Sequence, residues 1–394
     1  MTNKTNCILV INAGSSSLKF KIFQEKDLLD INYGQIVGIG TSKVTMTIKT
    51  SDTKKVIKEE VLPSSIARDN ILAYLLENLL TLVPHLTIKY AAHRVVHGGR
   101  KYNAPTIITQ EVIDDLKTIE NLSPIHLPHN IRPMELLKQQ FPTIKQVACF
   151  DTAFHSTNPD YTRYYAIPRK LIEEDQIMRY GFHGLSYEYI SGRLKEIDPQ
   201  VAQGKVVVCH LGAGASLCAL VNGKSFTTTM GFTPLDGLVM GSRCGAIDVG
   251  ILLFLMQNKG YTPKDIEQLV YYQSGVLGLS EESSDFYVIQ NSQNPKAQEA
   301  WQVFLYNLIK HIGSCIAAMG GIDALVFTAG VGENSAHLRT EITKNFSFLG
   351  LILNEVANNN KDELISAINS KIKIYVIPTQ EEFIIAKHAA LLLN

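Results

Sequence analysis

Hydrophobic residues along this chain fall into short β-branched runs and into longer segments whose apolar positions recur with a helical period. The short runs are typical of strands and lie at residues 7–11, 18–23, 90–96, 146–150, 206–209, 217–221, 324–328 and 372–377. A further stretch, 43–61, alternates like an antiparallel strand pair, with Ser51-Asp52 at its turn. The helical segments lie at 69–83, with Asp69 as the expected cap, and at 110–119, 132–140, 187–197, 249–256, 296–319 and 382–393. Because strands alternate with helices in both halves, the pattern predicts an α/β fold.

One pair of apolar runs, Val206–Cys209 and Leu217–Val221, is joined by the very small residues Gly212-Ala213-Gly214-Ala215-Ser216. Two strands with such a loop predict a hairpin whose backbone amides can approach a ligand closely. Amides exposed in this way bind anionic oxygens, typically those of phosphates. A loop of small residues is also common as a plain turn, so the motif alone leaves both readings open.

A similar stretch near the start of the chain strengthens the phosphate reading. The segment from Ala13 to Leu18 aligns with the segment from Gly212 to Leu217, since both read as strand, small-residue loop, Ser-Leu and strand. We interpret this as a degenerate internal repeat, which predicts two domains of related topology. Coincidence is the alternative, because Gly/Ser turns between strands are frequent.

A chain of 394 residues is longer than a single core usually supports, so two domains are expected. We place the boundary near Asp151. Residues 1–150 then form an N-terminal domain, to which the closing helix 382–394 is expected to return, and residues 151–381 form a C-terminal nucleotide-binding domain.

Charge and cysteine usage exclude several classes of protein. Lys plus Arg and Asp plus Glu both number 37, and a net charge of zero argues against a general nucleic-acid or membrane-surface role. The six cysteines are scattered without a C-x-x-C pair, which favours a reduced, cytoplasmic chain. No apolar stretch is long enough to span a bilayer, and the first apolar run is too short for a signal peptide.

Polar residues just past strand ends are the first candidates for chemistry, since ligands of α/β folds gather at the carboxyl ends of strands. The residues in such positions are Asn12, Arg94, Asp151, His210 and the loop Gly330-Val331-Gly332-Glu333-Asn334. The glycine loop is expected to open a helix whose N-terminus favours phosphate, although a simple turn explains it equally well. Asp151 is suited to orienting or deprotonating a substrate, or to capping the next turn.

Two arginines, Arg94 and Arg243, lie beside glycines and suit a fork for a carboxylate or phosphate, with an ordinary ion pair as the alternative. His93 and His97 have the spacing of a helical zinc site but lack its Glu and lie in a strand-like segment. His183 stands between glycines, where a histidine is usually structural or solvated.

Two further histidines, His126 and His129, read as loop histidines between prolines, without metal-ligand context. Two glycine-framed arginines, two phosphate-type hairpins and the lack of a serine or thiol triad pattern together favour phosphoryl transfer. In that chemistry positioning and charge neutralisation do most of the work.

Taken together, these stretches closely resemble the acetate kinase family, in the superfamily of acetate and sugar kinases, chaperones and actin. The matching segments follow the family order between residues 7 and 387, and they are 12–19, 93–99, 150–155, 180–184, 210–216, 330–334 and 378–382. The resemblance implies a two-domain, actin-like fold (a duplicated ribonuclease H-like fold) with the active site in the cleft between the domains. It also implies a homodimer that transfers the γ-phosphoryl group of ATP directly to acetate, with Mg²⁺ or alternatively Mn²⁺.

The resemblance also implies roles for individual residues. Asn12 and Glu381 would organise the metal, Arg94 and Arg243 would hold the acetate carboxylate and the transferring phosphoryl, His183 would stabilise that phosphoryl, and Asp151 would be the essential carboxylate. The pocket for the acetate methyl group would consist of Val96, Phe182 and Pro234. The ATP-binding set would consist of Lys19, His210, Leu211, Gly212, Ala213, Gly214, Asp285, Phe286, Tyr287, Gly330, Val331, Gly332, Glu333 and Asn334.

Several positions depart from the family pattern, among them Cys244, which stands where the family has Ser. Ala213 stands where the family has Asn, Ala246 where it has Asp, and Tyr287 where it has Arg. These changes bear on the choice and affinity of the phosphoryl donor. Within this enzyme class, the alternatives are a propionate kinase and an acetate kinase that uses another donor, such as GTP or pyrophosphate. An actin-like or chaperone-like nucleotide switch and an inactive paralogue are the alternatives outside this chemistry.

Overall fold

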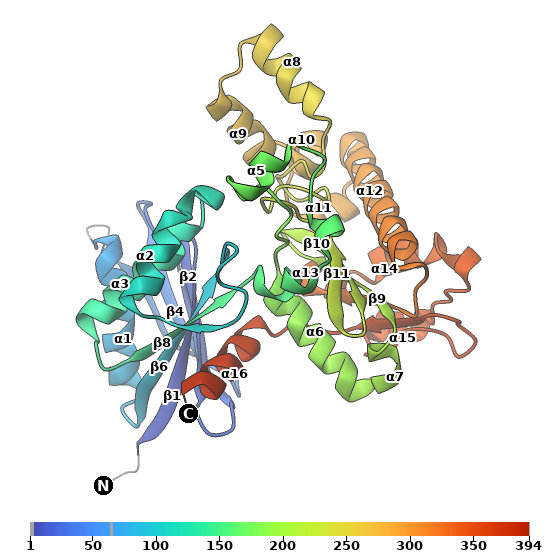
Figure 1. Cartoon of the computed structure of the whole chain (residues 1–394). Coiled ribbons are helices and arrows are strands. Elements are labelled where there is room, and N and C mark those ends of the chain that lie inside the picture. Colours follow the sequence, from blue (N-terminus) through green and yellow to red (C-terminus); the bar gives the residue numbers. More distant parts are fainter. Residues whose placement is uncertain (1–3, 64–65, 394) are drawn as a thin grey trace. The chain divides into compact units, whose positions relative to one another are not determined.

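The computed structural model describes residues 4–63 and 66–393 (Figure 1). The chain divides into two compact units. The first unit comprises the residues up to Ala153 together with those from Gln380 onward, and the second comprises Phe154–Thr379.

Among the described residues, the first unit holds a sheet of strand order β5-β4-β3-β2-β1-β6-β8-β7. The strands are β1 Thr5–Ala13, β2 Ser17–Gln24, β3 Asp30–Val37, β4 Val44–Thr50, β5 Val56–Leu62, β6 Leu86–Val95, β7 Thr106–Ile107 and β8 Lys145–Phe150. The helices are α1 Ile71–Leu82, α2 Gln110–Thr118, α3 Leu127–Gln140 and α16 Glu381–Leu393. The β1 strand is buried almost throughout, because the core residues of α1 pack against it and α16 contacts β1, β6 and β8.

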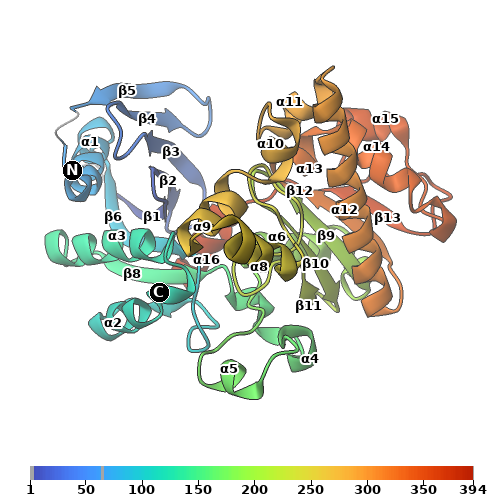
Figure 2. The same cartoon turned by 90° about the horizontal axis from the view of Figure 1, so that it is seen from above.

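The second unit holds a sheet of order β11-β10-β9-β12-β13 in the described part of the chain. Its strands are β9 Lys205–Leu211, β10 Ala215–Val221, β11 Lys224–Thr228, β12 Ala324–Thr328 and β13 Lys373–Val376. The helices are α4 Asp160–Arg163, α5 Arg169–Glu173, α6 Gly184–Ile197, α7 Pro199–Ala202, α8 Val249–Lys259, α9 Pro263–Tyr272, α10 Gly275–Ser280, α11 Phe286–Asn291, α12 Pro295–Met319, α13 Ala329–Asn334, α14 Ala336–Lys344 and α15 Glu355–Asn360. Apolar residues of α6 pack on the face that carries Val206 and Val208, and α12 lies along β9 and β10 (Figure 2).

The two sheets confirm the internal repeat. The order β3-β2-β1-β6-β8 in the first unit corresponds to β11-β10-β9-β12-β13 in the second. In both, the first three strands are antiparallel and the last two are added in parallel. The two small-residue loops therefore occupy corresponding places: one joins β1 to β2, and the other joins β9 to β10.

Some local predictions were wrong at helix ends. Asp69 does not cap α1: it lies in a 3-10 turn before that helix, and its carboxylate binds Arg132. His129 lies inside α3, which begins at Leu127 because Pro128 fits the first helical turn. His126 lies in the turn that precedes this helix, as predicted, so only the prediction of a loop position for His129 was wrong.

In the described residues, no helix combines the length and apolar character needed to cross a membrane.

Candidate active site

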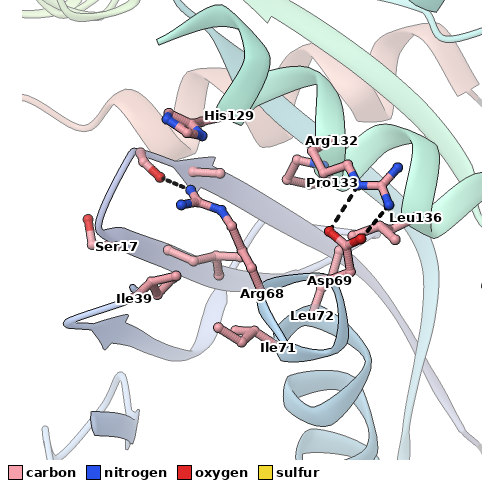
Figure 3. A pocket seen from close by; sticks show the side chains of 13 residues that line it. Ser17, Ile39, Arg68, Asp69, Ile71, Leu72, His129, Arg132, Pro133 and Leu136 are labelled. Atoms are coloured by element: carbon pink, nitrogen blue, oxygen red, sulfur yellow. Dashed lines mark hydrogen bonds and ion pairs between the residues drawn. The ribbon is translucent and has the colours of Figure 1, made fainter. Parts of the chain in front are cut away.

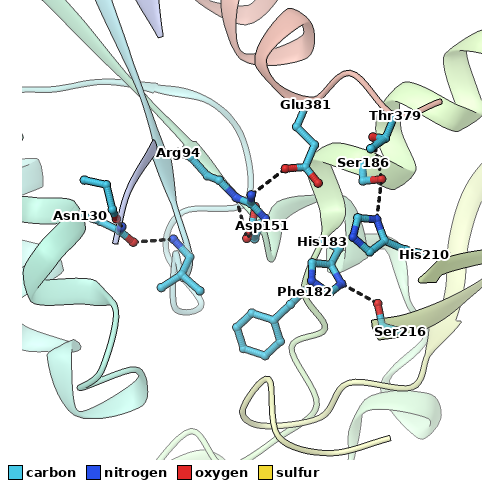
Figure 4. A network of polar contacts seen from close by, with 12 residues as sticks. Arg94, Asn130, Asp151, Phe182, His183, Ser186, His210, Ser216, Thr379 and Glu381 are labelled. Atoms are coloured by element: carbon cyan, nitrogen blue, oxygen red, sulfur yellow. Dashed lines mark hydrogen bonds and ion pairs between the residues drawn. The ribbon is translucent and has the colours of Figure 1, made fainter. Parts of the chain in front are cut away.

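In the first unit, Arg94 gathers two acidic residues around its guanidinium group (Figure 4). Its Nε donates to both oxygens of Asp151 at 3.0 and 3.1 Å, and its Nη2 donates to Oδ2 at 2.9 Å. Its Nη1 donates to Oε2 of Glu381 at 2.6 Å. The parallel pairing of β6 with β8 explains the first contact, since the Asp151 amide donates to the Val95 carbonyl at 2.9 Å.

Burial and charge act in opposite directions on this cluster. Burial raises the pKa of Asp151, although the charge of Arg94 counteracts it. Burial also raises the pKa of Glu381 to about 7, with Arg94 opposing the shift and Asp151 reinforcing it. Burial would lower the pKa of Arg94, but Asp151 and Glu381 raise it above its usual value, so the guanidinium stays charged.

Of the other candidates in this unit, Asn12 and Lys19 lie opposite each other in the β1–β2 register. Lys19 lines a cavity of about 330 Å³ together with Lys21, Lys49 and Glu382, among others. Lys19 therefore lies at an open, polar part of the sheet.

Val96 follows β6 and packs against the apolar cluster of α2 and α3. Its amide donates to Oδ1 of Asn130 at 2.9 Å, and Nδ2 of Asn130 donates to the carbonyl of Ala13 at 2.7 Å. Asn130 thus ties the ends of β6 and β1 together. The sequence holds no signal for this role, because the partners are far apart in the chain.

Arg68 holds the first hairpin loop from outside (Figure 3). Its Nη1 donates to the carbonyl of Ser15 at 2.7 Å and its Nη2 to the carbonyl of Gly14 at 2.8 Å. With Asn130 bound to Ala13, three successive carbonyls of this segment accept hydrogen bonds from side chains. This arrangement fixes the direction of the peptide groups in the loop, which sequence reasoning missed entirely.

In the second unit, His183 is held from two sides (Figure 4). Its Nδ1 is hydrogen-bonded to Oγ of Ser216 at 2.8 Å. Its ring stacks on that of His210, with centroids 4.1 Å apart and planes inclined by 16°. His210 in turn is bonded through Nδ1 to Oγ of Ser186 at 2.9 Å.

The backbone before His183 is also unusual. His183 has φ 58° at the residue preceding α6, and Gly181 has φ 75°. A Cβ at Gly181 would lie 2.5 Å from Cγ2 of Thr228 and 2.6 Å from Cδ2 of His155, so only glycine fits there. His155 also bonds the Phe182 carbonyl through Nε2 at 2.9 Å, and the Phe182 side chain is buried.

The second hairpin loop brings three candidates together. A Cβ placed on Gly214 would lie 3.5 Å from Nε2 of His183 and 3.8 Å from Nη1 of Arg243. The Gly212 amide donates to the Gly214 carbonyl at 3.1 Å, so this amide closes the loop instead of facing a phosphate, contrary to the sequence interpretation. The backbone next to His183 and Arg243 is therefore that of Gly214, whereas Leu211 buries its side chain in the core.

Arg243 donates from Nη1 to the carbonyl of Pro234 at 3.0 Å, and burial lowers its pKa from the usual value. In the part of the chain that the structure describes, no carboxylate forms an ion pair with Arg243. The guanidinium is therefore a partly buried positive charge that lies next to Gly214 and His183. Such a site favours an anionic ligand.

The candidate nucleotide-binding segments differ in their exposure. Asp285 precedes α11 and accepts from the Tyr287 amide at 2.9 Å, while the Tyr287 side chain is 76% exposed. Phe286 packs on Phe304, with ring centroids 4.5 Å apart, so its side chain belongs to the core. Ala213 and Ala246, two other positions that depart from the family pattern, are exposed.

The Gly330–Asn334 segment lies within the helix α13, Ala329–Asn334, which follows β12 directly. The prediction of a helix after this strand is therefore confirmed, whereas the glycine turn expected before it is part of the helix itself. Arg339 is fully buried and holds this segment, donating from Nη1 to the Gly332 carbonyl at 2.8 Å and to the Glu333 carbonyl at 3.1 Å. Oε1 of Glu333 accepts from the Thr379 amide at 3.1 Å. Val331 is partly buried and Asn334 donates to the Gly330 carbonyl at 2.8 Å.

Comparison with known proteins places these residues in a family. The family model described as the acetokinase family matches residues 7–387. The chain belongs to the acetokinase family. It is 41% identical over 391 residues to the acetate kinase of Rhodopseudomonas palustris, covering 98% of both chains, and 41% identical over 383 residues to that of Rickettsia akari, covering 96% of this chain and 97% of the relative.

Solved structures of the family agree with this fold. The acetate kinase of Porphyromonas gingivalis matches with a TM-score of 0.90 at 33% identity, covering 99% of this chain and 100% of that one. A propionate kinase from Francisella tularensis matches with a TM-score of 0.91 at 34% identity, covering 97% and 98%. The fold is thus the actin-like fold of this family, with the duplicated core described above.

Proposed function

We propose that this chain is an acetate kinase, which transfers the γ-phosphoryl group of ATP to acetate and forms acetyl phosphate and ADP. Besides its membership of the acetokinase family, one observation carries the proposal. Nε2 of His183, Nη1 of Arg243 and the backbone of Gly214 meet at one point of the second unit. Donors converging in this way stabilise the charge on the equatorial oxygens of a transferring phosphoryl group.

The reaction needs positioning and charge neutralisation but no general base. Acetate has a pKa near that of Glu, about 4.3, and is already ionised at neutral pH. An oxygen of acetate forms a bond to the γ-phosphorus while the bond from that phosphorus to the bridging oxygen of ADP breaks. ADP leaves with the electron pair of that bond, so no proton has to move.

Arg94 and Asp151 are proposed to act together in this step. Arg94 would bind the acetate carboxylate, and Asp151, held by Nε and Nη2, would fix the plane of the guanidinium. The buried carboxylate would thus position the substrate indirectly. Val96, Phe182 and Pro234 are proposed to contact the methyl group.

The acidic residues near Arg94 fit a divalent metal. No cluster of three or more His, Cys, Asp or Glu ligands occurs among the described residues, and Mg²⁺ needs only one or two carboxylates in addition to phosphates and water. We propose that Glu381 and Asn12 hold Mg²⁺, or Mn²⁺ in its place, with their oxygen atoms. When bound, the metal would neutralise charge on the phosphates of ATP.

Lys19 and the two hairpin loops are proposed to bind the phosphates of ATP. His210, Ala213 and Gly214 would contribute from the second loop, whereas the Gly212 amide is already bound to the Gly214 carbonyl. The second unit would be the nucleotide-binding domain, with the segments 285–287 and 330–334 near the nucleoside. Phe286 and Leu211 bury their side chains, so these two residues would contact the nucleotide through their backbone.

A second candidate is propionate as the acceptor, because a propionate kinase is among the similar structures. Other phosphoryl donors also merit a test, since Ala213 and Tyr287 depart from the family pattern.

The test is acyl phosphate formation trapped with hydroxylamine. Acetate, propionate and butyrate are combined with ATP, GTP and pyrophosphate, and the highest kcat/KM is expected for acetate with ATP. A higher kcat/KM with propionate would assign the chain as a propionate kinase. A higher kcat/KM with GTP or pyrophosphate would assign that compound as the phosphoryl donor. A lack of product with every pair would remove the kinase activity altogether.

We also propose that the chain forms a homodimer through the helix α8. Every residue of α8 is partly or fully exposed, yet its side chains include those of Val249, Ile251, Leu253 and Phe254. An exposed helix that is apolar all round is typical of an interface between subunits.

The six cysteines are free, which supports a reducing, cytoplasmic location.

A further inference from the structure

The hydrogen bond at Nδ1 of His183 continues to a buried tyrosine. Oγ of Ser216, 2.8 Å from Nδ1, also lies 2.5 Å from the hydroxyl of Tyr187. Ser216 comes from β10, and Tyr187 lies one helical turn after His183 in α6. Both Ser216 and Tyr187 have no exposed surface. The three side chains thus form a dry relay, with the Ser216 hydroxyl between a phenol and an imidazole.

Counting donors and acceptors decides the direction of this relay. Each hydroxyl carries one hydrogen, and in the described residues the hydroxyl of Tyr187 has Ser216 as its hydrogen-bond partner. If Tyr187 donates to Ser216, then Ser216 donates to Nδ1 of His183, and both hydroxyl hydrogens are used. If Nδ1 instead carried a proton and donated to Ser216, one buried hydroxyl hydrogen would have no acceptor. Leaving a buried donor without an acceptor is unfavourable, so the first arrangement prevails.

We propose that Ser216 and Tyr187 are positioning residues that keep His183 neutral, with its proton on Nε2. This inference rests on the proposed role of His183 in phosphoryl transfer and extends it to two residues that do not touch the substrate. Burial raises the pKa of Tyr187 well above its usual value, so the phenol remains a donor. The stacked ring of His210, itself held by Ser186, keeps the imidazole of His183 from turning.

The consequence is a donor aimed at the reacting group. Nε2 of His183 lies 3.5 Å from the point where a Cβ on Gly214 would stand, and Nη1 of Arg243 lies 3.8 Å from the same point. With the proton on Nε2, the imidazole can donate to an oxygen of the phosphoryl group beside the charged guanidinium. With the proton on Nδ1, a lone pair would face that oxygen instead. Ser216 and Tyr187 would thus matter for kcat more than for substrate affinity.

The tautomer can be measured without any substrate. In full-length protein labelled with ¹⁵N-histidine, two-bond ¹H–¹⁵N correlation spectra distinguish protonated from unprotonated ring nitrogens. His183 is assigned by the loss of its signals in His183→Gln. We expect Nε2 protonated and Nδ1 unprotonated at neutral pH, and the reverse pattern would overturn the proposal.

Three variants separate positioning from simple packing. Ser216→Ala removes the partner of Nδ1 and leaves the Tyr187 hydroxyl without an acceptor. The melting temperature and kcat should therefore fall, and His183 should populate both tautomers. We expect kcat to fall by about 10–100-fold, with each KM changed by less than about threefold. Ser216→Ala combined with Tyr187→Phe removes the orphaned hydroxyl, so the melting temperature should recover while kcat stays low. The matched control is Ser191→Ala. Ser191 lies in α6, as Tyr187 does, and donates to the Gly223 carbonyl, so this variant should keep the kcat of the native protein.

The outcomes distinguish this inference from the proposed function. If His183→Gln keeps full kcat, the role of His183 in transfer is wrong, whereas the spectra still test the relay. If His183→Gln is inactive but Ser216→Ala keeps full kcat and a single tautomer, the relay is wrong and the proposed function stands. Recovery of kcat together with stability in the double variant would likewise reduce Ser216 to a packing role.

Discussion

At the scale of single residues, Arg94 shows why an arginine is suited to this position. One guanidinium group binds two separate carboxylates from three of its nitrogen atoms, which a lysine cannot do. Removing one member of a buried, hydrogen-bonded charge cluster leaves the other charges uncompensated. Both the geometry and the charge balance of this cluster therefore depend on the fork of Arg94.

Arg94→Lys is expected to lower kcat by about 100-fold or more, because the bidentate contact with Asp151 is lost. The matched control is Arg132→Lys, since Arg132 also binds two carboxylates, those of Asp69 and Glu135, but its side chain is 44% exposed. That variant should keep kcat within about twofold, as surface ion pairs contribute little. Equal effects on kcat in steady-state assays would show that Arg94 has no special role.

Ala213→Asn is expected to lower the KM for ATP, because the resemblance to the family predicts Asn at this position of the loop that we propose to bind the phosphates. The added amide can donate to a phosphate oxygen, and one hydrogen bond to a charged group contributes about 1.5–3 kcal/mol. The KM should therefore fall by about tenfold or more, with the KM for acetate unchanged. An unaltered KM for ATP would place residue 213 away from the phosphates.

Buried histidines make stability depend on pH. Burial lowers the pKa of His93, of His97 and of His155 to about 4, from a usual value of 6.5. Between these two values the unfolded chain binds more protons than the folded chain, so the free energy of unfolding should be largest above pH 6.5 and should fall as the pH drops toward 4. The expected loss is on the order of a few kcal/mol for each histidine.

Urea unfolding across this pH window measures the effect. His93→Gln keeps a polar side chain beside Gln146 but cannot gain a proton, so its free energy of unfolding should fall less steeply with acid than that of the native protein. Parallel pH profiles for the two proteins would exclude His93 as a contributor.

At the scale of elements, the paired hairpins show where sequence patterns succeed and where they fail. The strands β1, β2, β9 and β10 were predicted because apolar, β-branched runs next to small-residue loops depend mainly on neighbouring residues. The Asp69 cap failed because a distant residue, Arg132, binds that carboxylate. The turn expected at Gly330 is a helix instead, and the buried Arg339 holds its carbonyls from another helix.

Arg68→Met is expected to raise the KM for ATP by about 10-fold while leaving the fold intact. The side chain is similar in length, but the carbonyls of Gly14 and Ser15 lose their donors, so the first hairpin loop, which we propose to bind phosphates, becomes less ordered. Each lost hydrogen bond to a charged group corresponds to about 1.5–3 kcal/mol at most, discounted here because Arg68 is partly exposed. The readouts are the KM for ATP and the melting temperature. Arg68 and Arg132 line one pocket of the first unit (Figure 3), so Arg132→Met is the control. Unchanged KM values in Arg68→Met would contradict this role.

At the scale of the whole molecule, the apolar side chains of α8 remain exposed in a single chain. Leu253 is 54% exposed and Phe254 is 51% exposed, and burying such side chains against a second copy would remove apolar surface from water. The corresponding prediction concerns oligomeric state.

Replacing both Leu253 and Phe254 by Asp should convert the proposed dimer to a monomer, as measured by sedimentation velocity. The matched control replaces Tyr161, which is 76% exposed on α4, by Asp and should leave the oligomeric state unchanged. A native protein that sediments as a monomer at every concentration would exclude the dimer, and a dimer that survives the double substitution would place its interface elsewhere.

The sequence by itself determined the α/β class, the two related halves and the family to which the chain belongs. These features follow from local periodicity and from short motifs in a fixed order, and both can be read along the chain. The tertiary structure alone decided which groups bind one another: the two carboxylates on Arg94, the hydrogen bonds of Arg68 and Asn130 to the first hairpin loop, and the relay from Tyr187 through Ser216 to His183. The physical reason is that these hydrogen bonds join residues distant in the chain or require the counting of donors in a dry interior, and neither leaves a pattern in the order of residues.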